Sequence, residues 1–350
     1  MEEPAASTSS VLPATKRAAA FSPEIVRKLQ PHELCDDLNG RLNSLAFNAD
    51  GRLLLASEAD STELHLLDFS RPNAPLHFAA TPHRAAHAQF TRHDEVIYAD
   101  RSDGRVNVLS LEKRQTVGCL VGHQKPVSKI ALSLVDDLVI TTAPDREVRV
   151  WELRAQNKVS TLRPDEPLLI ARQPSGGLFA TAAPNRWLKL YDVRFLERGE
   201  VARGDMAGVA AGAWTDLSFS PDGRALLVTP REGPLVVLET AFGRVLQTLE
   251  PLSTAENTAA AFSPCSGFVA AGAADGRLAF WEAASGRLLR KTAAERAPLG
   301  LLAFNPAAEL LVSGGRQLQL WGACECPEHA PVPLDHAAVF RRLMKLARPN

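Results

Sequence analysis

Residues 121–153 read VGHQKPVSKIALSLVDDLVITTAPDREVRVWEL, and this stretch decides the fold. It holds an apolar strand around Leu132, an acidic turn and a second apolar strand. A polar turn at Asp145 follows, and the third strand ends in the aromatic–acidic pair Trp151-Glu152. Short runs of β-branched and aromatic residues, separated by turn residues, predict strands rather than helices.

The same unit recurs seven times along the chain. Its first strand is expected to centre on Phe or a substitute, at Phe47, Phe90, Leu132, Arg172, Phe219, Phe262 and Phe304. Its third strand is expected to end at Leu67, Leu109, Trp151, Tyr191, Leu238, Trp281 and Trp321, at intervals of 40–47 residues. A period near 40–45 residues, with four short strands per unit, is typical of WD repeats. The sequence therefore predicts an all-β fold, a seven-bladed WD40 β-propeller over residues 21–322.

The two ends of the chain predict how the ring closes. After Trp321 the sequence GACECPEHAPVP is not that of a strand, so the last blade lacks an outer strand there. The segment Lys28–Leu34 is placed to supply this strand and to remove the exposed edge. Residues 1–20, rich in Ala, Ser and Pro, are expected to be a disordered extension. Residues 323–350 are expected to form a tail with a short amphipathic helix at Leu334–Ala347.

Composition restricts the class of partner. The 350 residues include 39 basic and 40 acidic ones, a formal net charge of −1, which gives no field favouring nucleic acid or an anionic membrane. Five scattered cysteines fit a reducing compartment. The polar N-terminus MEEPAASTSS does not resemble a signal peptide, and no apolar run approaches the length of a membrane span. The expected protein is intracellular, monomeric on its own, and binds neither nucleic acid nor membrane directly.

The third unit predicts a buried polar line. In WD repeats a histidine, a hydroxyl, an aspartate and a tryptophan at these positions hydrogen-bond one another, and here they are His123, Thr141, Asp145 and Trp151. A buried imidazole or carboxylate without a partner is costly, so the four residues are expected to be structural rather than catalytic.

The sequence predicts no catalytic residue, no cofactor and no metal. The cluster Cys324-x-Cys326 with His329 and His336 departs from zinc spacing, and neither a phosphate loop nor a nucleophile elbow occurs. An enzyme would need converging carboxylates or a metal at the central channel, whereas the inner strands are expected to be apolar.

Basic residues recur in the turns between second and third strands, and these turns share one face of a propeller. They are Arg101, Arg146, Arg186 and Arg231, with Lys125 in the loop that opens the third unit. Guanidinium groups on such a face suit the phosphates of a peptide. The alternative is that each is a solvated turn residue beside the acids Asp103, Asp145 and Glu232.

A third-strand end in the fourth unit carries a second candidate site. The sequence Tyr191-Asp192-Val193-Arg194 resembles the box by which some WD proteins dock onto cullin ubiquitin ligases. That box is short and common in WD repeats. The structural alternative is that Asp192 and Arg194 form an ion pair at a buried edge.

Longer strings resemble one family. The third unit (Val121-Gly122-His123, then Leu132-Ser133), the fourth unit (188–194) and the fifth unit (Trp214-Thr215, then Ala241-Phe242-Gly243) resemble the family of WD repeat-containing protein 82, known in yeast as Swd-two. The resemblance runs from about Ser22 to Trp321. The strings of the fourth and fifth units are its most specific part, because generic WD repeats do not share them.

The resemblance implies a non-catalytic subunit of nuclear assemblies. One is the COMPASS-type SET-domain histone methyltransferase complex, and another is the phosphatase-1 or cleavage-and-polyadenylation machinery of transcription termination. The family is also linked to the phosphorylated tail of RNA polymerase II. The expected function is thus a nuclear scaffold that binds partner peptides, and the alternative is a substrate receptor of a cullin-type ubiquitin ligase.

Overall fold

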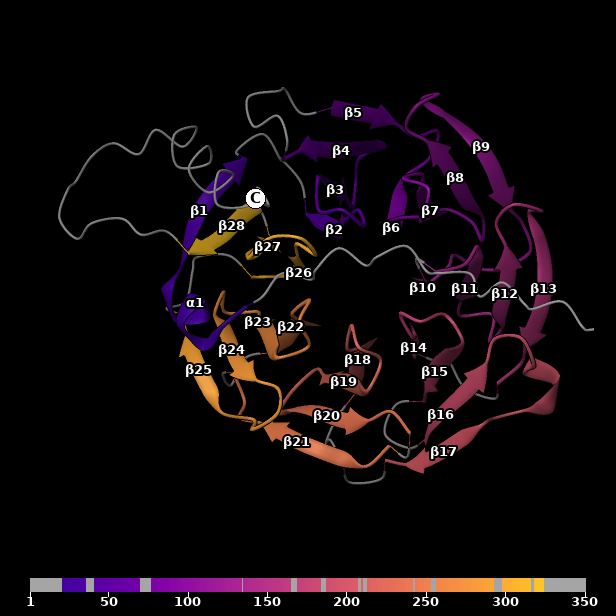
Figure 1. Ribbon diagram of the computed structural model, residues 1–350. Helices are drawn as coiled ribbons and strands as arrows, with labels where there is room; N and C mark the ends of the chain where they lie inside the picture. Colours follow the sequence, from indigo (N-terminus) through magenta and orange to yellow (C-terminus); the bar gives the residue numbers. More distant parts are fainter. Residues whose placement is uncertain are drawn as a thin grey trace, which may run out of the picture.

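Seven four-stranded antiparallel sheets form a ring of blades in the computed structural model (Figure 1). In each blade the strand order follows the chain from the innermost strand outward, except where the ring closes. The structure describes residues 21–35, 41–69, 77–133, 135–164, 169–183, 187–206, 209, 213–241, 243–252, 256–292, 298–315 and 318–323. The seven-bladed WD40 propeller predicted from the sequence is confirmed.

The first four blades occupy the upper and right-hand part of Figure 1. Blade 1 contains β2 (Leu42–Phe47), β3 (Leu53–Glu58), β4 (Glu63–Asp68) and β5 (His77–Ala80). Blade 2 contains β6 (Ala85–Phe90), β7 (Val96–Asp100), β8 (Val106–Ser110) and β9 (Gln115–Leu120). Blade 3 contains β10 (Lys129–Leu132), β11 (Leu138–Thr142), β12 (Val148–Glu152) and β13 (Asn157–Leu162). Blade 4 contains β14 (Leu169–Arg172), β15 (Leu178–Ala182), β16 (Trp187–Asp192) and β17 (Ala202–Asp205), with the 3-10 helix η1 (Leu196–Arg198) before β17.

The remaining blades complete the ring. Blade 5 contains β18 (Trp214–Phe219), β19 (Ala225–Pro230), β20 (Leu235–Glu239) and β21 (Val245–Leu249). Blade 6 contains β22 (Asn257–Phe262), β23 (Phe268–Ala273), β24 (Leu278–Glu282) and β25 (Leu288–Lys291). Blade 7 contains β26 (Leu301–Phe304), β27 (Leu310–Gly314) and β28 (Leu318–Ala323), and its outer strand is β1 (Leu29–Cys35).

The N-terminal strand closes the ring as predicted. β1 pairs antiparallel with β28, with Leu29 opposite Ala323, so the expected segment Lys28–Leu34 is shifted by one residue. The short helix α1 (Pro23–Lys28) precedes it and packs against β25 and β28 (Figure 1). Phe21 contacts Phe304 of the innermost strand edge to face, with 5.3 Å between ring centroids. The predicted extension (1–20) and C-terminal helix (334–347) lie outside the described residues.

The first-strand marks lie at the ends of the inner strands, not at their centres as expected. Each mark is the last residue of its strand. A short polar residue follows in most blades, and its side-chain oxygen accepts a hydrogen bond from the backbone of the next turn. Asn48 accepts from the Leu53 N–H at 2.9 Å, and Ser220 accepts from the Ala225 N–H at 2.9 Å. Such side chains compete with the sheet ladder, so they end the strand there.

The hydrophobic core is divided among the blade interfaces. Seven clusters of buried apolar side chains each join two neighbouring blades. At the interface of blades 6 and 7, for example, Phe280 packs in one cluster with Leu311 and Trp321, and all three are buried. Each blade therefore depends on both of its neighbours, which makes the ring a rigid frame for the loops at its two faces.

The ring has two faces, the loop face and the turn face. The loop face carries the connections between blades and those between second and third strands. The turn face carries the turns between first and second strands and between third and fourth strands. No helix among the described residues has the length and apolar character needed to cross a bilayer.

Candidate functional site

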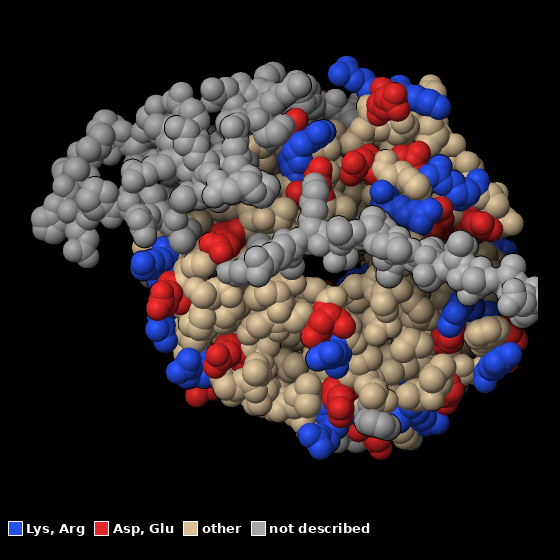
Figure 2. Space-filling model, viewed as in Figure 1, with Lys and Arg blue, Asp and Glu red and all other residues tan. Residues whose placement is uncertain are grey.

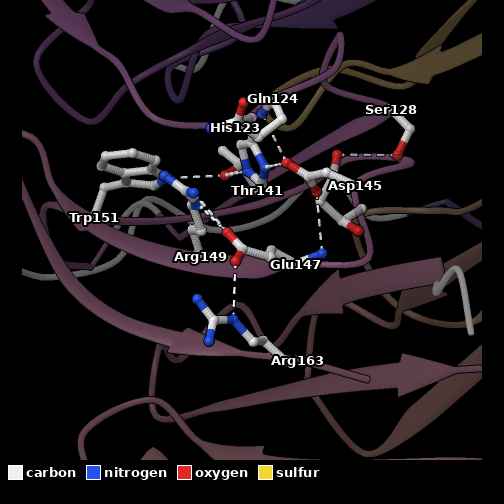
Figure 3. Close-up of polar contacts among 10 residues, drawn as sticks. His123, Gln124, Ser128, Thr141, Asp145, Glu147, Arg149, Trp151 and Arg163 are labelled. Carbon is white, nitrogen blue, oxygen red and sulfur yellow. Dashed lines mark hydrogen bonds and ion pairs between the residues drawn. The ribbon is translucent and has the colours of Figure 1, made fainter. Parts of the chain in front are cut away.

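The four residues of the predicted polar line meet in blade 3 (Figure 3). His123 Nδ1 lies 2.8 Å from an Asp145 oxygen, and its Nε2 lies 2.7 Å from the Thr141 hydroxyl. Trp151 Nε1 donates to the same hydroxyl at 2.8 Å. The His123 side chain is fully buried, so this line is enclosed by protein rather than open to a substrate.

The directions of the hydrogen bonds follow from the available protons. The indole N–H of Trp151 donates to Thr141, whose hydroxyl donates to His123 Nε2, and His123 Nδ1–H donates to Asp145. In this arrangement both ring nitrogens of a neutral His123 have a partner, Nε2 as an acceptor and Nδ1 as a donor. Burial lowers the pKa of His123, outweighing the opposite effect of Asp145, so the ring stays neutral near pH 7.

The carboxylate of Asp145 ends the line at the loop face. Burial acts to raise its pKa, but three hydrogen bonds outweigh this effect and the pKa lies below its ordinary value. The donors are the backbone N–H groups of Gln124 and Glu147, each at 3.0 Å, and His123. The line therefore ties the connection between blades 2 and 3 to the β11–β12 turn, a structural task.

Other blades keep only parts of this line. In blade 7, Trp321 Nε1 donates to the Ser313 hydroxyl at 2.9 Å. In blade 6, Trp281 is fully buried, but its Nε1 has no hydrogen-bond partner among the residues that the structure describes. A tryptophan on the third strand thus does not by itself predict the complete hydrogen-bonded line of histidine, hydroxyl, aspartate and tryptophan.

The predicted basic residues of the loop face are only partly brought together. Arg101 and Lys125 lie in adjacent loops, since Gly104 of the β7–β8 loop abuts the backbone of His123, and Arg146 lies in the β11–β12 turn of blade 3. We call Arg101, Lys125 and Arg146 the loop-face arc. Arg231 lies apart in blade 5, and Arg186 lies outside the described residues.

The arc retains uncompensated charge. Arg101 donates to the Ala59 carbonyl at 3.1 Å, while Lys125 and Arg146 are exposed and have no ion-pair partner among the described residues. Arg231 Nε instead lies 4.0 Å from a carboxylate oxygen of Glu256, so its ion pair is with Glu256 and not with the neighbouring Glu232. Elsewhere basic and acidic side chains are interspersed, as the face in Figure 2 shows.

Asp192 and Arg194 form an ion pair in which Asp192 is partly buried and Arg194 is exposed. The guanidinium binds both carboxylate oxygens, at 3.1 and 2.9 Å, and the Arg194 side chain is 67% exposed. Its hydrogen bonds to Asp192 lower the pKa of that carboxyl. Phe195, itself partly exposed, lies between Arg194 and Arg198, whose guanidinium carbon is 4.2 Å from the ring centroid. The expected ion pair is therefore present, but its Arg194 end is exposed and not buried.

Charged groups also meet in the central channel, where apolar inner strands were expected. Lys129 of β10 in blade 3 pairs with Asp216 of β18 in blade 5, across the intervening blade. His87 of β6 faces both, at a bulge where its φ is +52°. The pKa of His87 is lowered to about 4, mainly by burial and also by Lys129 and Arg101, while Asp216 acts in the opposite direction. The expectation of purely apolar inner strands is wrong, and β-bulges in β6 and β18 accompany two of these polar side chains, His87 and Asp216.

The buried neutral histidine gives a testable pH dependence. Between pH 6.5 and about 4 the unfolded chain binds a proton at His87 that the native protein does not, so the free energy of unfolding falls as the pH falls through this window. The contribution is fully present above about pH 6.5. His87→Asn, which tolerates positive φ, is expected to remove up to about 1.4 kcal/mol per pH unit from this slope. Urea unfolding at several pH values measures it, and an unchanged slope would contradict the assignment.

No group of three or more potential metal ligands occurs within the described part of the chain. The cluster of Cys324, Cys326, His329 and His336 lies outside it. The Thr141 hydroxyl, His123 and Asp145 form a hydroxyl–imidazole–carboxylate line, but this line is enclosed in blade 3. The arrangement suits binding of other macromolecules.

Comparison with known proteins agrees with this arrangement. Residues 114–152 and 254–282 match the family model described as WD domain, G-beta repeat. The chain is 24% identical over 301 residues to WD repeat-containing protein 82 of Drosophila melanogaster, covering 85% of this chain and 95% of that protein. It is 26% identical over 319 residues to COMPASS component SWD2 of Saccharomyces cerevisiae, covering 85% and 94%. Set1 complex component swd2 of Schizosaccharomyces pombe is 25% identical over 212 residues, 59% of each chain.

The ring of seven blades and the two WD-domain matches define the chain as a WD-repeat propeller. Within that class it is similar to WD repeat-containing protein 82 and SWD2, which confirms the resemblance predicted from its sequence strings.

Proposed function

We propose that this chain is a non-enzymatic scaffold subunit of a nuclear, COMPASS-type histone methyltransferase complex. The observation that carries the proposal is similarity along most of both chains to SWD2, which is named as a COMPASS component, and to WD repeat-containing protein 82. The seven interlocked blade interfaces support it, since a rigid ring presents preordered loops to partner segments. By the same resemblance, a phosphatase-1 or cleavage-and-polyadenylation complex of transcription termination is a second assembly that this propeller serves.

The loop-face arc supports a finer part of the proposal. Lys125 and Arg146 have no acidic partner among the described residues, and Arg101 binds only a backbone carbonyl. A phosphate carries up to two negative charges and several acceptor oxygens, which match such side chains. We therefore assign the phosphorylated tail of RNA polymerase II, or a similar phosphopeptide, to this arc.

The alternative function is a substrate receptor of a cullin-type ubiquitin ligase. The exposure of Arg194 favours it, because an exposed guanidinium held in place by Asp192 is available to an adaptor protein. Phe195 beside it adds apolar contact area, and aromatic residues with arginine are enriched at binding hot spots.

Affinity purification of the tagged protein from nuclear extract tests these assignments. The parent protein is expected to bring methyltransferase subunits together with polymerase that is phosphorylated on its tail. The double variant Lys125→Glu/Arg146→Glu reverses two exposed charges, so it is expected to lose at least about tenfold of the polymerase while keeping the methyltransferase. Arg194→Ala is the matched control and is expected to change neither.

Three results would contradict the proposal. Cullin and its adaptor as the main partners, lost in Arg194→Ala, would replace the scaffold function with the ligase alternative. Phosphatase or cleavage factors without methyltransferase would move the protein to the termination machinery. Polymerase retained by Lys125→Glu/Arg146→Glu would remove the phosphopeptide assignment and leave the scaffold function in place.

A further inference from the structure

A cavity of about 160 Å³ lies between blades 2 and 3 on the turn face. Its apolar wall is formed by Val108 of β8, Val117 of β9 and Leu153, which follows β12. These three side chains extend the hydrophobic cluster of that blade interface outward to the surface. An aliphatic chain entering from solvent would therefore continue the core of the interface.

Most charged side chains around the cavity form ion pairs with one another. The carboxylate of Asp137 lies 2.9 Å from Arg92 Nη2, 3.2 Å from His93 Nε2 and 3.6 Å from Arg154 Nε. Arg92 also donates to the Val135 carbonyl at 2.9 Å. Asp137 is thus fully engaged by the side chains of Arg92, His93 and Arg154.

Glu95 is the exception. It lines the same cavity at the start of β7, and no ion pair or side-chain hydrogen bond involves its carboxylate among the described residues. A partly buried carboxylate in a cavity with one apolar wall is stabilised by a cation that brings its own apolar stem.

The cavity admits a side chain rather than a strand. The outer edge of β9 would be the natural place for an added peptide strand, but the Gln156 side-chain amide already occupies it. Gln156 donates to the Val117 carbonyl at 3.1 Å and accepts from the Cys119 N–H at 3.3 Å. Gly118 lies beneath this amide, and a Cβ there would come within 2.8 Å of it. The edge is therefore protected, and the cavity beside it stays open.

We propose that this cavity binds the side chain of a lysine or arginine from a partner protein, with the methylenes against Val117 and Leu153 and the cationic head on Glu95. The proposal rests on the propeller being a binding platform, but it does not depend on which complex it joins. It uses the turn face, so a partner held here leaves the loop-face arc free.

Methyl-group NMR of the full chain, titrated with N-acetyl-argininamide and N-acetyl-lysinamide, tests the site. Both probes are expected to shift the methyl signals of Val117 and Leu153 in a saturable way. N-acetyl-norleucinamide has a similar aliphatic chain without the charge, and it is expected to bind about fivefold more weakly. Glu95→Gln is expected to weaken the two cationic probes by the same factor, whereas Glu112→Gln, an exposed glutamate of the same blade, is expected to change nothing.

The proposal is overturned if the cationic probes shift no methyl signal of the cavity. It is also overturned if norleucinamide binds as well as they do, or if Glu95→Gln binds them like the parent protein. None of these outcomes bears on the nuclear purification, so failure here and failure of the scaffold proposal are distinguishable.

Discussion

Replacing Leu29 with aspartate is expected to open the ring. Leu29 is fully buried on the closing strand β1, opposite Ala323 of β28, and it packs in the cluster that contains Phe280 and Trp321. The change removes an aliphatic side chain from a packed core and places a carboxylate there without a partner. Together these effects are expected to lower the free energy of unfolding by about 4 kcal/mol or more.

Opening the ring has a second consequence. β28 would lose its outer neighbour, and an unpaired strand edge is a template for pairing with another chain. Leu29→Asp is therefore expected to self-associate with rising protein concentration. Urea unfolding and size-exclusion chromatography measure the two effects.

The adjacent residue provides the control for Leu29→Asp. Gln30 lies on the same strand but is exposed, so Gln30→Asp introduces the same charge without burying it. Its effect on the free energy of unfolding is expected to stay within about 0.5 kcal/mol. Equal losses in both variants would mean that charge near β28, and not the closing contact of Leu29, destabilises the protein.

The blade count and the closing strand were predictable because they depend on local patterns that recur. Each unit repeats an apolar strand, a polar turn and an aromatic third-strand end, and one missing strand at the C-terminus implies one at the N-terminus. The line from His123 to Trp151 was predictable for the same reason, since its members lie within a single unit.

The channel pair and the cavity were not predictable in this way. Lys129 and Asp216 belong to blades 3 and 5, and only the closed ring and the inner-strand register bring them together. The cavity at Glu95 is formed by two strands and one turn of blade 2 and by two turns of blade 3. A single sequence shows the periodicity of each blade, but it does not show which side chains of different blades face one another.

Arg172 combines both situations. The repeat identified it as a substitute for the Phe that ends the inner strand in most blades, but two of its partners, Asp136 and Leu138, come from blade 3. Its side chain is fully buried, and Nη2 donates to Asp136 at 2.7 Å and to the Gly176 carbonyl at 3.0 Å. Nη1 donates to the Leu138 carbonyl. The guanidinium thus joins blade 4 to blade 3, at the strand-end position where five of the other blades carry a phenylalanine.

Arg172→Ala is expected to lower the free energy of unfolding by about 3–5 kcal/mol. The variant leaves a cavity at the blade interface, deprives Asp136 of its cation and frees two carbonyl groups. The double variant Arg172→Leu/Asp136→Asn fills the space and removes the unpaired charge, and Leu is the residue that blade 3 carries at this position. Because apolar packing often replaces a buried ion pair at little cost, the double variant is expected to recover more than half of the loss in urea unfolding. If it is as unstable as Arg172→Ala, the hydrogen bonds from Arg172 to the carbonyls of Leu138 and Gly176, and not the ion pair, account for the stability that Arg172 provides.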